Sequence, residues 1–288
     1  MIFSLLLSYY MYSSNKNIDK TVIIKHDQNI ILKVINGIVT IRGWDNNSIQ
    51  IKGIVESGIN ELFLKSQGNN YLIIAKPNYK KVIRNTKKQN CYLDIYMPKN
   101  NNLSIQSNNA DITINGLKSN LDINSIGGRI QINAESGNLN LQTVSGNFSV
   151  YGSSDIIEGM SLNGLFIIEG NHPVLKLKTS NGNMFFKIDS PKNINAFTTY
   201  GEINMEYKNI ENTNMNIDNI HGITKLFLTG HEDIKLLIKS ISGKILVDNL
   251  KFDEFIKKNK EVNIKNKNGR SSIFIETLNG DIILNSKK

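Results

Sequence analysis

Apolar residues alternate with polar ones in short runs along most of this chain, and the runs recur at a nearly constant spacing. In the clearest copy, Leu139 and Leu141 precede Gly146, and Phe148 and Val150 follow it. We call Gly146 the turn residue of this unit and number the other positions from it, so that Leu139 is at position −7 and Val150 at position +4. Alternation over a few residues is typical of a β-strand, whose successive side chains point to opposite faces. The unit therefore predicts two short strands joined by a glycine turn.

The unit recurs along the chain at a nearly fixed step. Successive turn residues are 18 residues apart from Ala110 to Gly182, and then 19, 21 and 21 residues apart as far as Gly243. Positions −7 and +4 are apolar in all ten units, whereas a hydrophobic content of 40% would give about four in ten by chance. The turn residues are Gly37, Ala110, Gly128, Gly146, Gly164, Gly182, Gly201, Gly222, Gly243 and Gly280. A repeat of fixed period predicts one structural unit stacked many times.

Equal steps allow equivalent positions to stack in layers about 4.8 Å apart. The inward columns then merge into one core, and each unit buries its apolar side only against its neighbours. We therefore predict an all-β fold, a parallel single-stranded β-helix (β-solenoid) with coils of about 18–21 residues. We expect the apolar residue at position −2, such as Ile126 or Val144, to point inward at the turn. A meander of antiparallel hairpins could use the same turns and remains the alternative.

The N-terminal third of the chain departs from the regular pattern. Residues 30–44 are a clean copy of the unit, but the alternating stretches in 45–102 miss its register. We interpret 15–102 as an N-terminal β segment whose antiparallel hairpins start the stack, and 103–288 as the regular solenoid coils.

The C-terminal units contain an insert, because Gly243 and Gly280 are 37 residues apart. Within it, residues 251–260 place Phe252, Phe255 and Ile256 at helical spacing, which predicts a short amphipathic helix. The outward positions of the last coils are also apolar, and a covering helix would protect that face. The positions expected beneath the helix are Leu237, Leu246, Phe274 and Ile283.

Residues 1–14 are apolar and uncharged, and they end in small residues before the chain becomes polar. This pattern predicts a signal peptide, although it lacks a basic start and is shorter than the usual ~15–30 residues. A start codon assigned too late accounts for both departures. We therefore expect an extracytoplasmic or cell-envelope location, whereas a native first strand in 1–14 would make the protein cytoplasmic. No apolar run reaches the ~20 residues that a transmembrane helix needs.

The formal net charge of +9 is unevenly distributed along the sequence. Residues 107–250 carry 11 Lys or Arg against 14 Asp or Glu, whereas 1–106 carry 14 against 6 and 251–288 carry 9 against 5. A protein that binds polyanions more often concentrates positive charge along its body. We therefore do not expect nucleic acid as a partner.

Two surface features are candidates for partner contacts. Leu165, Ile167 and Phe185 are apolar where the pattern points outward, so they form a partner patch or lie under a loop or a dimer contact. Residues 76–90 hold six Lys or Arg and no acid, which indicates a solvated hairpin loop or a contact for an anionic surface. The candidate contacts in that loop are Lys80, Lys81, Arg84, Lys87 and Lys88.

The sequence contains no pattern that indicates a catalytic, cofactor or metal site. The four histidines have no paired ligand spacing. Cys91 lies in a strand and is interpreted as a small hydrophobic residue. Solenoid lyases and hydrolases need carboxylates clustered on adjacent coils, but Asn140 separates Asp122 from Glu158 in their shared column. We therefore predict that the protein is not an enzyme.

One polar trio stands at a predicted coil corner, where His231, Glu232 and Asp233 follow one another. We interpret it as a solvated turn in preference to a metal site.

Several stretches of the chain resemble a known family. Residues 37–45 read GIVTIRGWD, Leu93–Lys99 is a strand that ends in Met-Pro-Lys, and units of the form S/T-x-x-G-x-I-x-I include 143–150. Together they resemble the DUF4097-type putative adhesin family of bacterial β-strand-repeat proteins, over most of 30–288. The resemblance implies a β-helix-like domain of extracytoplasmic or envelope-associated proteins. It implies no ligand and no functional residues, and the 21-residue coils and the 251–260 insert depart from the family pattern.

We therefore expect a non-enzymatic, envelope-associated β-solenoid that acts as a binding or scaffolding surface, for an envelope polymer or another protein. Two other classes stay open. A carbohydrate-processing enzyme on this scaffold would need a groove with two or more carboxylates on stacked coils. A self-assembling structural element would need flat, unpaired terminal coils.

Overall fold

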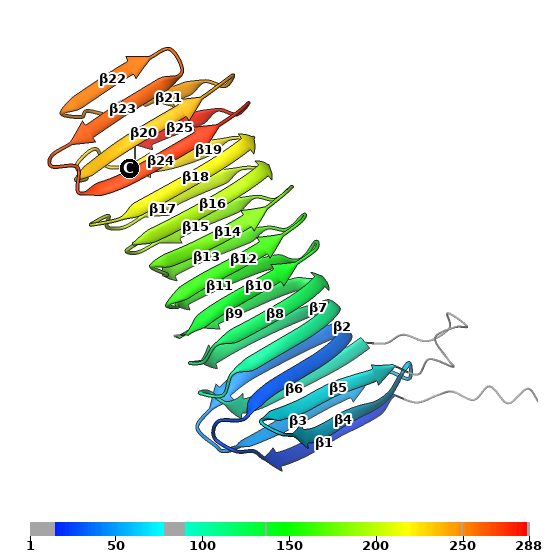
Figure 1. Ribbon diagram of the computed structural model, residues 1–288. Coiled ribbons are helices and arrows are strands. Elements are labelled where there is room, and N and C mark those ends of the chain that lie inside the picture. Colours follow the sequence, from blue (N-terminus) through cyan, green and yellow to red (C-terminus); the bar gives the residue numbers. More distant parts are fainter. Residues whose placement is uncertain (1–14, 78–89, 136, 249, 287–288) are drawn as a thin grey trace, which may run out of the picture.

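The computed structural model describes residues 15–77, 90–135, 137–248 and 250–286. These residues form 25 β-strands, and none of them lies in a helix. The strands stack into one elongated body with the N-terminal strands at one end and the C-terminal strands at the other (Figure 1). The predicted signal peptide in 1–14 and the basic loop of Lys80, Lys81, Arg84, Lys87 and Lys88 lie outside the described residues.

Each regular coil contributes one strand to each of two parallel sheets. The first sheet contains β8 (Leu121–Gly127), β10 (Asn138–Thr143), β12 (Ile156–Ser161), β14 (Val174–Thr179), β16 (Asn193–Tyr200) and β18 (Asn214–His221). The second contains β9 (Arg129–Ala134), β11 (Asn147–Ser153), β13 (Phe166–Asn171), β15 (Met184–Ile188), β17 (Ile203–Tyr207) and β19 (Thr224–Leu228). Neighbouring coils pair in parallel and in register. The predicted parallel solenoid is confirmed.

The core is a set of apolar columns between the two sheets. Val150 pairs in register with Ile132 on one side and Ile168 on the other, and all three side chains are fully buried. The ten residues at position −7 are all buried, and those at position +4 are buried in nine units, with Val247 half-buried. The columns that the repeat predicts are therefore the columns that exclude water.

The prediction for the turn is wrong at position −2, which points outward. Ile126 is 55% exposed and Val144 is 46% exposed. The inward residue at the turn is instead at position −3, where serine, threonine or asparagine recurs. Buried examples are Ser107, Ser125, Ser161, Thr179, Thr198, Asn219, Ser240 and Thr277. In some coils the hydroxyl bonds to the backbone of the turn, as when the Gly146 N–H donates to Thr143 Oγ1 at 2.7 Å. The hydroxyls of Ser161, Thr179, Ser240 and Thr277 are buried without a hydrogen bond to a described residue.

At the N-terminal end, β2 (Asn29–Trp44) forms a complete coil that pairs in parallel with β7 (Leu103–Leu117). Its other side pairs in parallel with β5 (Asn70–Pro77) and β6 (Asn90–Pro98), which come later in the sequence. Antiparallel strands close this end. β4 (Ile59–Gln67) pairs with β5, and β3 (Ser48–Val55) pairs with β6 on one side and with β1 (Lys16–Ile23) on the other. The predicted antiparallel hairpins are confirmed.

At the C-terminal end the coils do not follow sequence order. The last strands, β24 (Ser271–Thr277) and β25 (Ile282–Ser286), pair in parallel with β18 and β19. Their other sides pair in parallel with β20 (Ile234–Ser240) and β21 (Ile245–Val247), which come earlier in the chain. Figure 1 shows the red strand β24 between β18 and β20. We call this arrangement the coil exchange.

The predicted helix over 251–260 is wrong. β22 (Glu254–Lys258) pairs antiparallel with β23 (Glu261–Asn266), which pairs antiparallel with β20. An edge strand such as β20 carries unpaired backbone groups that a hairpin satisfies, whereas a short helix is marginally stable in water. Leu246 remains 48% exposed, so the expected covering of this position is also wrong.

Candidate binding face

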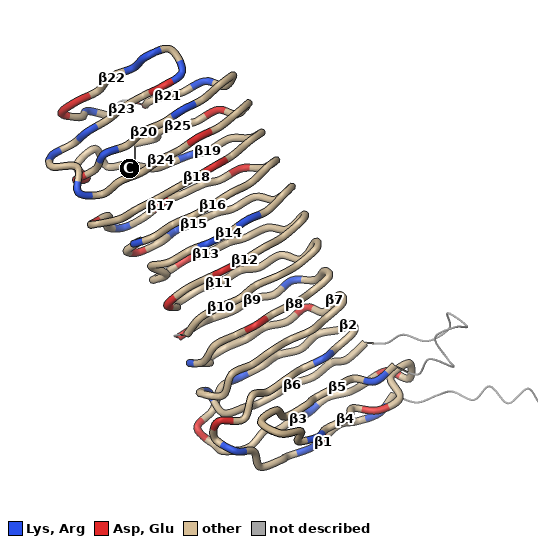
Figure 2. The backbone as a smooth tube through the Cα atoms, in the orientation of Figure 1, with Lys and Arg blue, Asp and Glu red and all other residues tan. Residues whose placement is uncertain are grey.

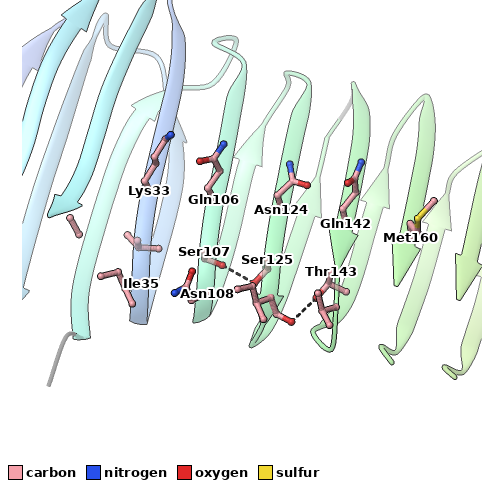
Figure 3. Close-up of a pocket in the computed structure, with 14 residues that line it drawn as sticks. Lys33, Ile35, Gln106, Ser107, Asn108, Asn124, Ser125, Gln142, Thr143 and Met160 are labelled. Carbon is pink, nitrogen blue, oxygen red and sulfur yellow. Dashed lines mark hydrogen bonds between the residues drawn. The ribbon is translucent and has the colours of Figure 1, made fainter. Parts of the chain in front are cut away.

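The first sheet presents a row of outward side chains, one from each layer at position −4. Lys33, Gln106, Asn124 and Gln142 follow one another on β2, β7, β8 and β10, and Met160 continues the row on β12 (Figure 3). Because equivalent positions of parallel, in-register strands stack, the row runs along the solenoid axis.

A groove of about 550 Å³ lies beside this row. The carboxamides of Gln106, Asn124 and Gln142 line one side, and Ile126 and Val144 at position −2 line the other. Apart from Lys33, every described residue that lines the groove is uncharged. The groove therefore offers hydrogen-bonding groups along one side and an aliphatic surface along the other.

Hydroxyl groups at position −3 fix the turn beneath the groove. Ser107 Oγ and Ser125 Oγ are 2.8 Å apart, and Thr143 Oγ1 donates to the Ile126 carbonyl oxygen at 3.5 Å (Figure 3). Val144 N in turn donates to the Ser125 carbonyl oxygen at 3.3 Å. These bonds link successive layers, so the aliphatic side chains at position −2 are held in a straight row.

Two further depressions, of about 400 and 520 Å³, lie on the same sheet and share lining residues with the groove or with each other. Gln142 and Met160 line both the groove and the 400 Å³ depression. Asn140 and Glu158 line both of the further depressions. The three together form one continuous surface from β5 to β18, which we call the amide face.

An asparagine ladder crosses the amide face at position −8. Asn102 Nδ2 donates to Asn29 Oδ1 at 3.2 Å. The backbone N–H of Asn120 donates to Asn102 Oδ1 at 3.2 Å, and that of Asn138 donates to Asn120 Oδ1 at 2.9 Å. Stacked amides of this kind bond to the next layer and stabilise the parallel register.

Charged groups gather where the amide face approaches the coil exchange. Lys176 Nζ lies 2.8 Å from Glu158 Oε1, so those two charges compensate each other. Asp218 on β18 and Glu276 on β24 are register partners. Burial, and then the negative charge of Glu276, raise the pKa of Asp218. The coil exchange thus brings together two carboxylates that are far apart in the sequence.

The predicted partner patch lies on the opposite sheet. Ile167 and Phe185 are register partners on β13 and β15, and Leu165 precedes β13. All three side chains are half-buried. Their contact with a partner stays a prediction.

Sequence reasoning missed the amide face, because Asn and Gln at outward strand positions look like any solvated surface.

The histidine and cysteine environments are interior ones. His172 is fully buried, with Nδ1 2.8 Å from Ser154 Oγ and Nε2 3.1 Å from the Glu169 carbonyl oxygen. Cys91 is fully buried, and burial followed by the charge of Glu56 raises the pKa of its thiol to about 12. Neither group is accessible to a substrate. No cluster of three or more His, Cys, Asp or Glu residues suited to a metal occurs in the part of the chain that the structure describes.

No helix among the described residues is both long enough and apolar enough to cross a membrane. No curated protein matches the chain. Among solved structures, a putative adhesin from Bacteroides fragilis NCTC 9343 is 13% identical, with 94% of this chain and 98% of that chain covered and a TM-score of 0.47. A putative adhesin from Parabacteroides distasonis ATCC 8503 is 11% identical with the same coverages and a TM-score of 0.45.

A putative lipid binding protein from the same Parabacteroides strain is 14% identical, with 94% and 97% of the two chains covered and a TM-score of 0.39. The family model described as Toastrack DUF4097 matches residues 28–285, which span nearly the whole solenoid. The family resemblance of the sequence motifs is thereby confirmed, and the chain belongs to the Toastrack DUF4097 family.

Proposed function

We propose that this protein is a non-enzymatic binding protein of the cell envelope, and that its amide face holds an extended, uncharged polysaccharide. The observation that carries the proposal is the continuity of the groove across successive coils, with carboxamides on one side and aliphatic groups on the other. A polymer that lies along the solenoid axis meets equivalent groups in every layer. Many weak contacts then add up along one chain.

The chemistry of the two sides matches that of a sugar chain. Carboxamides donate and accept hydrogen bonds, as sugar hydroxyls do. The C–H faces of a sugar ring are apolar and pack on aliphatic side chains such as Ile126 and Val144, which are available to solvent. The layer spacing of about 4.8 Å is close to the length of one sugar residue, so successive sugars meet successive layers.

The charge distribution favours an uncharged polymer. Lys33 is the one ionisable residue among the described residues that line the groove, and Lys176 and Glu158 compensate each other further along. Figure 2 shows no continuous stripe of Lys and Arg along the described part of the stack. The apolar segment 1–14, which the sequence predicts to be a signal peptide, supports a location where envelope polysaccharides are present.

Affinity electrophoresis in gels that contain neutral polysaccharides (dextran, mannan and a soluble β-glucan) tests the proposal. We expect at least one of them to retard the protein, and polygalacturonate to retard it less. The combined variant Gln106→Ala, Asn124→Ala and Gln142→Ala should lose the retardation. Its matched control changes Thr113, Gln131 and Ser149 to alanine, in the same layers but on the second sheet.

Equal retardation of the two triple variants would show that the amide face is not the binding surface. Absence of retardation of the parent protein by every neutral polymer would reject the polysaccharide itself.

A carbohydrate-processing enzyme is the second candidate, and Asp218 and Glu276 favour it. Retaining glycosidases use two carboxyl groups about 5–5.5 Å apart, one of them a general acid with a raised pKa. Neighbouring strands place equivalent positions about 4.8 Å apart, and the pKa of Asp218 is raised. Release of reducing ends from a bound polysaccharide, abolished in Asp218→Asn, would establish the enzyme. Binding without any such release would leave the non-enzymatic function.

A further inference from the structure

Three turns meet at the corner of the stack where the coil exchange begins. They are residues 208–213 before β18, 229–233 before β20 and 267–270 before β24. A depression of about 250 Å³ lies between them, well away from the groove of the amide face. Figure 2 shows charged positions of both signs at the starts of β20 and β24.

Three acidic residues line this depression, Glu211, Glu232 and Asp233. Glu232 is the buried one, and the structure corrects its interpretation as part of a solvated turn. Its side chain is only 8% exposed. Tyr207 O–H donates to Glu232 Oε1 at 2.9 Å, and the Thr229 N–H donates to the same oxygen at 2.5 Å. Burial opposes ionisation, but hydrogen bonding by the backbone N–H groups of Thr229 and Glu232 and by the hydroxyls of Thr229 and Tyr207 outweighs it and lowers the pKa of Glu232. Glu232 is therefore a carboxylate at neutral pH.

The second oxygen of this carboxylate lacks a hydrogen-bond donor among the described residues. Glu232 Oε2 is buried and makes no hydrogen bond with any described residue. A buried, unpaired carboxylate oxygen is costly, so the fold retains an acceptor that a ligand can satisfy. The occupant must carry a hydrogen-bond donor, and a positive charge on it would compensate Glu232.

Basic groups line the same depression as Glu232. Arg270 Nε donates to Asp233 Oδ2 at 2.6 Å, and the Arg270 backbone N–H donates to Asp233 Oδ1 at 3.0 Å. Both oxygens of Asp233 are thereby occupied. The terminal nitrogens of Arg270 make no hydrogen bond with a described residue, and the side chain is 66% exposed. A planar guanidinium with free terminal N–H groups suits a carboxylate.

A divalent cation does not fit this arrangement. Calcium takes six to eight oxygen ligands and magnesium takes six, whereas the described residues hold no group of three or more His, Cys, Asp or Glu suited to a metal ion, and Lys208, Lys267 and Arg270 add positive charge to the lining. An ammonium group needs fewer acceptors. The depression is also smaller than the ~300–1,000 Å³ of drug-sized sites.

From this geometry we infer that the corner binds a small zwitterion, a free α-amino acid, with its ammonium on Glu232 Oε2 and its carboxylate on Arg270. The site is separate from the amide face, so it neither requires nor excludes polysaccharide binding. It exists only because the coil exchange brings the turn before β24 beside the turns before β18 and β20.

Titration calorimetry of the full chain with glycine, L-alanine and D-alanine tests the inference, with methylamine and acetate as controls. We expect at least one amino acid to bind, and each half-ligand to bind at least about tenfold more weakly, because each loses one charge-assisted contact. Glu232→Gln and Arg270→Gln should each weaken binding by about tenfold or more. The triple alanine variant of the amide face should bind amino acids as the parent does.

Arg270→Gln keeps the test decisive if Glu232→Gln does not fold, because Arg270 is an exposed side chain. Absence of binding of all three amino acids at millimolar concentration would overturn the inference. The inference would also be overturned if neither Glu232→Gln nor Arg270→Gln changed the affinity for amino acids, or if methylamine bound as tightly as the amino acids.

Discussion

Turn glycines such as Gly164 and Gly182 are required by the neighbouring coil more than by their own backbone conformation. A Cβ atom on Gly182 would lie 1.9 Å from the Gly164 carbonyl oxygen, and one on Gly164 would lie 2.3 Å from that of Gly146. The same close approach recurs along this column up to Gly243, whose Cβ would lie 1.7 Å from the Gly280 carbonyl oxygen. The backbones of these successive turns are thus in contact, and a side chain at Gly164 or Gly182 would separate the layers.

Gly182→Ala is expected to destabilise the fold by about 2–3 kcal/mol, as other overpacking substitutions do. The matched control is Gly68→Ala. Gly68 has a φ of 57°, and a Cβ atom added to it would meet no other atom within 4 Å, so only backbone strain of about 1 kcal/mol applies. Urea unfolding of the two variants measures the difference. Equal destabilisation would show that contact between the layers is not what selects glycine at the turn.

His172 should make the fold less stable at acid pH. Burial lowers its pKa below the ordinary 6.5, despite the opposing effects of the Glu169 carbonyl group and the charge of Asp189. Below pH 6.5 the unfolded chain takes up a proton that the folded protein does not yet bind. The free energy of unfolding therefore falls as the pH decreases through this range, by at most about 1.4 kcal/mol per pH unit.

Urea unfolding at several pH values between about 8 and 5 measures this slope. In His172→Gln the slope should be smaller, whereas His26→Gln, which changes an exposed side chain, should keep the slope of the parent. Parallel pH profiles for the parent and His172→Gln would refute the assignment.

Among the elements, the regular strands were predictable because alternation and a fixed step both act on many residues. Two local assignments failed for physical reasons. Aliphatic residues are usually buried, which predicts an inward position −2, but the small polar residue at position −3 takes the inward place, and in some coils its hydroxyl also bonds to the turn backbone. Phe252, Phe255 and Ile256 have helical spacing, but the free edge of β20 provides a hydrogen-bonding partner that no local pattern contains.

The hairpin of β22 and β23 depends on Asn259, which has a φ of 32° in the turn between them. Asparagine and glycine tolerate this region, whereas a β-branched residue does not. Asn259→Val should reduce the protection of β22 amides from hydrogen exchange by about tenfold, the equivalent of 1–2 kcal/mol. Asn259→Gly should leave it unchanged. Because β22 is an exposed edge strand, neither variant should alter protection in β8–β16, and a global loss would contradict its peripheral place.

At the scale of the whole molecule, both ends of the solenoid are closed in a similar way. At each end a coil from elsewhere in the sequence is inserted between two coils that follow one another in the sequence: β2 lies between β6 and β7, and β24 lies between β18 and β20. Antiparallel strands lie outermost at both ends. An inserted coil pairs on both sides, so it cannot fray without breaking two parallel interfaces. The outermost strand β22 carries Lys257 and Lys258, and charged edge strands oppose strand-to-strand association. This arrangement disfavours the self-assembling structural element as a function.

The coil exchange could not be predicted from the repeat. Gly222, Gly243 and Gly280 all satisfy the same pattern, and parallel in-register coils present the same apolar columns whichever order they take. The pattern therefore establishes which residues form a coil, but not which coils are neighbours. The corner with Glu232 and the pair of Asp218 and Glu276 both depend on that order. For this reason neither could be found as a site in the sequence.

Engineered disulfides distinguish the exchanged order from sequence order. Asn216 and Phe274 are register partners on β18 and β24, so cysteines at these positions are expected to bridge, because neighbouring strands place Cα atoms within the ~4.4–6.8 Å that a disulfide spans. Leu237 pairs with Phe274 on the far side of β24. It therefore lies two layers from Asn216, roughly twice 4.8 Å, which exceeds the ~7 Å limit for a bridge.

The two pairs of cysteines are introduced in separate variants. After mild oxidation, mass spectrometry should find the 216–274 bridge in the first variant and no 216–237 bridge in the second. The native Cys91 does not interfere, because it is fully buried at the opposite end. If β20 instead stacked directly on β18 in sequence order, the 216–237 pair would bridge efficiently, and the amino-acid site at the corner would lose its structural basis.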